Sequence, residues 1–164
     1  MGGRIRGAQP PKAGPKIEIV RITTAEVQKF LILGTAVFGQ QIHWYGGRSH
    51  ECSAIRGECE NCKRGWPSKW KGYLHAIRHP DSKECFIELT PTACQTLDAL
   101  IPAEENFRGK LLNFSKTKGG KHGRFIISVT ATTANMHGAP AELDPVNILR
   151  YLWACKTPSS KTQA

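Results

Sequence analysis

The amino-acid sequence predicts a mainly β domain of the small α+β type, with a metal-binding insertion and a C-terminal helix. Several short runs alternate apolar and polar residues and are rich in strand-forming side chains, whereas only two segments show helical spacing. Residues 41–67 are poor in aliphatic side chains but hold three cysteines and two histidines. Such a stretch cannot build its own apolar core, so a bound metal is expected to order it.

The N-terminal third predicts a flexible arm followed by strands. Residues 1–16 contain glycine, proline and four basic residues but no acid, which favours a flexible basic arm. Residues 16–22 alternate apolar and polar side chains and predict a strand. Residues 28–38 are also rich in strand formers and predict another. Residues 17–156 are expected to fold as one domain.

The middle of the chain predicts two strands and a helix. Residues 70–77 and 84–89 are strand-like and are joined by a turn at 79–82. Thr90 and Pro91 then form a helix start, with threonine as N-cap and proline in the first turn. The apolar residues that follow have helical spacing: Cys94, Leu97, Leu100 and Ile101.

The C-terminal part predicts a hairpin and a last helix. Residues 107–116 and 124–130 are its two arms, and the connection 117–123 is glycine-rich and basic. Asp144 and Pro145 begin the last helix, whose apolar stripe comprises Val146, Leu149, Leu152 and Trp153. The polar tail 157–164 is expected to be disordered.

This order of elements over roughly residues 17–130 resembles the OB-fold, a five-stranded barrel with a helix between its third and fourth strands. The insertion 41–67 would then lie between the first and second strands. The resemblance implies a ligand groove across the second and third strands, flanked by the first and fourth connecting loops.

A metal site is predicted within the insertion. The Cys59-x-x-Cys62 pair is typical of zinc knuckles, in which two thiolates meet one tetrahedral ion across a tight turn. Cys52 supplies a third ligand, and either His43 or His50 supplies the fourth. His43 is preferred because it ends an apolar strand that can aim its ring, giving the set His43, Cys52, Cys59 and Cys62 for Zn²⁺.

Two other interpretations of this cluster are less well supported. A redox Cys-x-x-Cys pair usually begins a helix in a βαβ unit, and no such unit is visible. A catalytic deaminase zinc would need a His-x-Glu motif and a proline before the cysteine pair, but Glu58 precedes Cys59. The sequence also lacks a nucleophile motif and a phosphate-binding loop, so a structural zinc and no enzymatic activity are predicted.

The charge predicts a polyanionic partner. The net charge is +10 and the isoelectric point about 9.6, which favours nucleic acid. Basic residues cluster without acids in 61–80, among tryptophan and tyrosine, and again in 106–141. Aromatic rings can stack on bases while cations hold phosphates. The predicted contacts are Lys63, Arg64, Trp66, Trp70, Lys71, Tyr73, Lys116, Lys118, Lys121 and Arg124.

The sequence therefore predicts a zinc-stabilised protein that binds single-stranded nucleic acid, with DNA favoured over RNA, as an accessory factor in replication, recombination or a related process. The alternative is a small subunit that docks on a larger nucleoprotein assembly. No apolar run is long enough to cross a bilayer, and no basic amphipathic helix favours a membrane surface. The expected location is the cytoplasm, on the nucleoid if the source is a bacterium, phage or plasmid.

Overall fold

The described part of the chain is built around one mixed sheet of eight strands. The computed structural model describes residues 17–53, 59–119, 123–130 and 134–154, so the predicted arm 1–16 and tail 157–164 lie outside the described residues. The strands are β1 (Glu18–Arg21), β2 (Gln28–Ile32), β3 (Phe38–Tyr45), β4 (Arg48–Glu51), β5 (Ser68–His79), β6 (Lys83–Leu89), β7 (Leu111–Lys116) and β8 (Phe125–Val129). The helices are α1 (Glu60–Lys63), α2 (Pro91–Leu100) and α3 (Pro145–Ala154). In the described part of the chain, the helices are too short and polar to cross a membrane.

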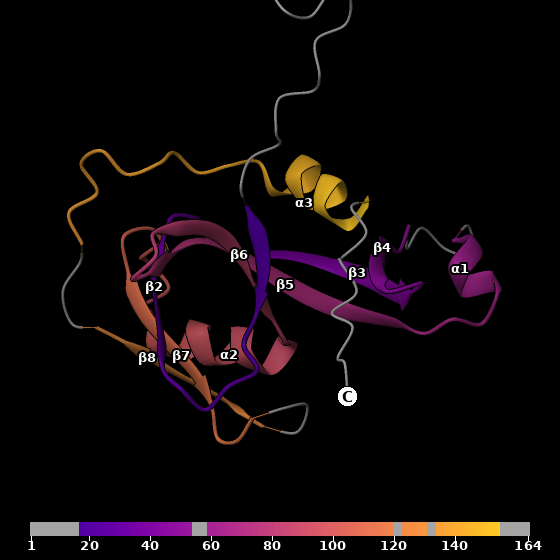
Figure 1. Cartoon of the computed structure of the whole chain (residues 1–164), viewed down its shortest axis with the longest axis horizontal. Helices are drawn as coiled ribbons and strands as arrows, with labels where there is room; N and C mark the ends of the chain where they lie inside the picture. The colour runs from indigo at the N-terminus through magenta and orange to yellow at the C-terminus, as the bar shows by residue number, and fades with distance from the viewer. Residues whose placement is uncertain (1–16, 54–58, 120–122, 131–133, 155–164) are drawn as a thin grey trace, which may run out of the picture.

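The long strand β5 organises the sheet. One edge pairs with β6, while the other pairs first with β3 and then with β2. Because β3 pairs with the first half of β5, which extends beyond β2, the β3–β4 hairpin and α1 project from the body as an arm (Figure 1). The candidate metal ligands lie in this arm.

The sheet is open within the described residues. Its strand order is β1-β6-β5-β2-β7-β8, and β1 runs parallel to β6 while the other pairs are antiparallel. None of the ladders among the described residues joins β8 to β1 or β6. The mainly β class and the terminal helix are thus confirmed, whereas these ladders do not close a barrel.

One apolar cluster lies inside the curve of the sheet. It joins side chains from both ends of the strand order, such as Val20 of β1 and Ile127 of β8, with Leu97 of α2. The N-cap prediction for α2 is confirmed, because the Thr90 hydroxyl accepts a hydrogen bond from the Ala93 N–H at 3.2 Å.

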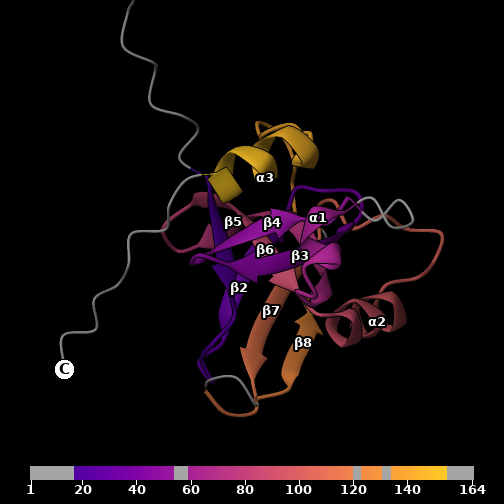
Figure 2. The same ribbon diagram turned by 90° about the vertical axis from the view of Figure 1, so that its right-hand side faces the viewer.

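A second apolar cluster lies beneath α3. Leu149 and Trp153 are buried there, and the Trp153 ring meets Tyr73 edge-on with centroids 5.7 Å apart. Figures 1 and 2 place α3 and α2 on opposite sides of the sheet. The sheet is therefore covered by α2 on one face and by α3 on the other.

Trp153→Ala is expected to lower the free energy of unfolding by about 3 kcal/mol, since it removes a large ring that is only 7% exposed. Urea denaturation checks this. The matched control is Tyr151→Ala on the same helix, whose side chain is 52% exposed and whose loss should be nearly neutral. Equal effects for the two variants would contradict this packing of α3.

Candidate metal centre and adjoining groove

Local structure brings four ligands together from three places in the arm. His43 lies on β3 and Cys52 follows β4, while Cys59 is the N-cap of α1 and Cys62 lies within that helix. The turn between β3 and β4 is Gly46-Gly47, with φ values of +61° and +76°. Glycine adopts this left-handed conformation without strain, so a two-residue loop can reverse the chain and return β4 alongside His43.

The spacing of these ligand atoms fits one tetrahedral metal ion. The His43 Nε2 atom lies 3.5 Å from the sulfur of Cys59 and 3.5 Å from that of Cys62. The sulfurs of Cys52 and Cys62 are also 3.5 Å apart, and all four atoms lie within 4.8 Å of one another. A tetrahedral ion with bonds of about 2.3 Å to sulfur and 2.0 Å to nitrogen needs separations of about 3.5–3.8 Å.

The electrostatics of the cluster also favour a cation. Backbone N–H groups, that of Cys62 foremost, hydrogen-bond the Cys59 sulfur and lower the pKa of its thiol to about 5, although burial opposes them. Burial, together with the neighbouring thiols, instead raises the pKa of Cys52. Three thiolates at this spacing repel one another, and a divalent cation would stabilise all of them in the ionised form.

The two histidines have different surroundings. The His43 ring is fully buried and its Nδ1–H donates to the Pro67 carbonyl at 3.1 Å, which turns Nε2 towards the sulfurs. A second hydrogen bond of this kind commonly orients a metal-binding histidine. The His50 ring is stacked on Tyr45 with centroids 3.6 Å apart and lies outside the cluster.

His43→Ala is therefore expected to abolish metal binding, whereas His50→Ala should still bind about one equivalent. Metal analysis of the two purified proteins measures this directly. The second variant is a matched control because it changes the histidine directly opposite His43 in the β3–β4 ladder. Loss of metal from His50→Ala with retention in His43→Ala would reverse the assignment.

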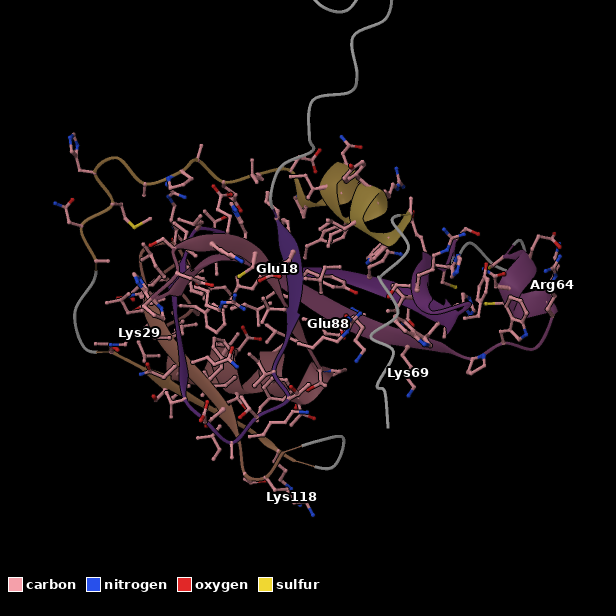
Figure 3. The ribbon with its side chains drawn as sticks, viewed as in Figure 1. Glu18, Lys29, Arg64, Lys69, Glu88 and Lys118 are labelled. Atoms are coloured by element: carbon pink, nitrogen blue, oxygen red, sulfur yellow. The ribbon has the colours of Figure 1, made fainter. Side chains whose placement is uncertain are left out.

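A stack of rings covers the arm next to the metal centre. Tyr45 lies between His50 and Trp66, whose ring centroid is 4.2 Å from that of Tyr45. The Arg64 guanidinium lies 5.7 Å from the Trp66 ring. Trp66 and Arg64, two predicted nucleic-acid contacts, thus pack against the arm, and Figure 3 shows Arg64 at its outer end.

A groove of about 860 Å³ runs from the base of the arm to the β7–β8 hairpin. Lys71 and Lys116, from the two predicted basic runs, both line it. The other charged and aromatic residues along it are Arg21, Lys69, Glu88, Trp44 and Phe125. Four cations and a single carboxylate therefore share its walls, together with two aromatic rings.

Cations and rings are paired along this groove. The Arg21 guanidinium lies 5.3 Å from the Trp44 ring and also donates to Glu88 at 3.3 Å. The Lys71 ammonium is 3.5 Å from the same Glu88 oxygen. At the other end, the Lys116 ammonium lies 5.2 Å from the Phe125 ring. The groove is therefore a positively charged channel with an aromatic ring near each end.

The prediction for Tyr73 needs correction. Its side chain is only 1% exposed and packs under α3, and its hydroxyl donates to Glu88 at 3.3 Å. Burial and the nearby carboxylate raise the pKa of Tyr73. The ring cannot stack on a base, because its position on β5 faces the second apolar cluster.

The remaining predicted contacts are dispersed. Trp70 is half-buried, with its ring against Gly39, where an added Cβ would lie 2.6 Å from the ring. Lys63 pairs with Glu60 at 3.2 Å on α1. Lys118 and Arg124 are exposed beside the β7–β8 connection, as Figure 3 shows for Lys118, and Lys121 lies outside the described residues.

Five charged or aromatic groove residues were absent from the predicted contacts, and two of them, Trp44 and Lys69, had a usable signal. Trp44 follows His43 in a strand, so alternation places it on the face opposite the buried ligand. Lys69 lies in the predicted basic run 61–80, two residues before Lys71. Arg21, Glu88 and Phe125 reach the groove only through pairing between distant strands.

Comparison of this chain with protein-family models, curated proteins and solved structures finds no match.

Proposed function

We propose that the cluster of His43, Cys52, Cys59 and Cys62 binds one structural zinc ion. Soft sulfur and imidazole ligands in a tetrahedral set are those that zinc prefers. Four protein ligands would leave no open position for a substrate, which supports a structural rather than a catalytic role. The ion would hold the β3–β4 hairpin against α1.

We further propose that the adjoining groove binds single-stranded nucleic acid, with DNA as the first candidate. The observation that carries this proposal is the set of four cations and two aromatic rings along one groove. Cations would neutralise the phosphates, and the rings of Trp44, 57% exposed, and Phe125 would stack on bases.

The strand connections support an OB-like architecture for this proposal. β2 pairs with both β5 and β7, and α2 lies between β6 and β7 in the chain. A single apolar cluster also joins the two ends of the strand order. In this interpretation β2 and β3 are the two halves of the first OB strand, and the groove crosses the second and third strands.

Salt dependence tests the nucleic-acid proposal. Affinity for a labelled single-stranded DNA oligomer should fall as the salt concentration rises. The double variant Lys69→Ala with Lys116→Ala should reduce the slope of log binding constant against log salt concentration by about 1.4, or about 0.7 per lost phosphate contact. The control pair is Lys29→Ala with Lys63→Ala, which removes the same charge outside the groove. Equal slopes for the two double variants would refute the groove as the binding surface.

The same titration distinguishes nucleic-acid binding from the alternative function, docking on a larger nucleoprotein assembly. A subunit that only docks on a larger replication or recombination assembly would bind neither DNA nor RNA oligomers when isolated. Measuring an RNA oligomer of the same length in parallel ranks RNA against DNA.

A further inference from the structure

The floor of the groove holds one carboxylate in a defined setting. Glu88, near the end of β6, is 9% exposed and is the sole acid among the residues that line the groove. One of its oxygens accepts from Arg21 and lies 3.5 Å from the Lys71 ammonium, and the other accepts from the Tyr73 hydroxyl. Figure 3 shows Glu88 between Glu18 of β1 and Lys69 near the start of β5.

This carboxylate disfavours a phosphate on the floor. A phosphate placed there would meet a like charge, and the two nearest cations already have Glu88 as a partner. Lys69 is exposed on one part of the groove wall, and Lys116 lies on another part of it. The phosphates of a bound strand are therefore expected along these walls, with the bases turned towards the floor.

Glu88 retains the capacity to accept one more hydrogen bond. A carboxylate has about four acceptor positions, accepts only, and here has three neighbouring donors. Cytosine carries an exocyclic amino donor at C4, adenine at C6 and guanine at C2, whereas thymine and uracil carry no amino group and present carbonyl oxygens at C2 and C4. Those oxygens would face the negative charge of Glu88.

We propose that Glu88 makes this groove selective for bases with an exocyclic amino group over thymine and uracil. This inference rests on the proposed nucleic-acid function and adds a base preference to it. The free oxygen position of Glu88 accepts the amino N–H, while Arg21 and Lys71 hold the carboxylate in place and Trp44 supplies a stacking surface beside it.

The test compares labelled oligomers of deoxycytidine and deoxyuridine of equal length at pH 8. These bases have the same ring size, so stacking is closely matched, and they differ at C4, which carries an amino group or a carbonyl oxygen, and at N3, which carries a proton only in uracil. The wild-type protein should bind the deoxycytidine oligomer about fivefold more tightly. An oligomer of N4,N4-dimethyldeoxycytidine, which has lost the amino donors, should lose that advantage on the wild-type protein.

Glu88→Gln should remove or invert the preference, because its amide can donate to the uracil carbonyl. Glu18→Gln is the matched control, since it removes one negative charge from β1 outside the groove and should keep the fivefold ratio. The dimethylated oligomer keeps the test valid even if Glu88→Gln does not fold. Tight binding without base preference, or a preference that survives Glu88→Gln or dimethylation, would overturn the inference alone. Binding to neither oligomer would overturn the proposed function itself.

Discussion

Cys59→Ala protein is expected to bind no zinc and to lose the ordered structure of the arm. In zinc-finger peptides the metal contributes about 10–16 kcal/mol, because binding and folding are coupled. The apolar cluster inside the curve of the sheet contains no residue from β3, β4 or α1. We therefore expect the rest of the sheet to remain folded while the arm opens.

Hydrogen exchange with metal analysis measures this loss region by region. Amides of residues 42–52 and 59–64 should lose protection in Cys59→Ala, whereas those of β6 and β7 should keep most of theirs. The control is Cys94→Ala, which removes a half-buried thiol on α2 outside the metal cluster. Unchanged protection of the arm in Cys59→Ala would mean that metal does not organise it.

Trp44→Ala is expected to weaken binding of a single-stranded oligomer by about tenfold to a hundredfold. Stacking of one base on an aromatic ring contributes about 1–3 kcal/mol. The Trp44 side chain is 57% exposed on a wall of the groove, and Arg21 is positioned 5.3 Å from its ring. Its loss should leave the fold intact, because little of the ring is buried.

Fluorescence anisotropy with a labelled oligomer measures the affinity change. Trp66→Ala is the matched control, since that ring packs on Tyr45 and does not line the groove. A change below threefold is expected for the control. If Trp66→Ala weakened binding more than Trp44→Ala, the nucleic-acid surface would lie on the ring stack of the arm instead.

Much of the fold and the whole ligand cluster could be predicted from local patterns. The alternation in residues 84–89 and the helix start at Thr90-Pro91 are local patterns, because they involve residues that are neighbours in the chain. The structure has β6 and α2 at these positions. The Cys59-x-x-Cys62 spacing is equally local. His43 could be preferred because the end of a strand gives a side chain a fixed direction.

The features that could not be predicted depend on pairing between distant segments. The β3–β4 hairpin lies within the insertion, where the polar sequence of β4 hides the alternation and only Gly46-Gly47 signals a turn. Tyr73 lies in a strand, as predicted, but the burial of its ring depends on packing against α3, which comes some 70 residues later in the chain. The groove likewise combines residues of β1 and of every strand from β3 to β8, so its members share no sequence motif.

The ligand cluster and the groove are joined through one strand. His43 and Trp44 are consecutive in β3 and point to opposite faces, one buried with the cysteines and the other exposed in the groove. Pro67 connects them again, because its carbonyl accepts from His43 while the residue lines the groove. A metal that fixes His43 would therefore also fix the position of Trp44.

The most direct test titrates one labelled single-stranded oligomer into zinc-loaded protein, into the same protein after complete removal of the metal, and again after zinc is restored. We expect salt-dependent binding by the loaded protein, loss of most of the affinity on metal removal, and recovery with one equivalent of zinc. Binding that is unchanged by metal removal, or no binding by the loaded protein, would contradict a zinc-stabilised nucleic-acid groove.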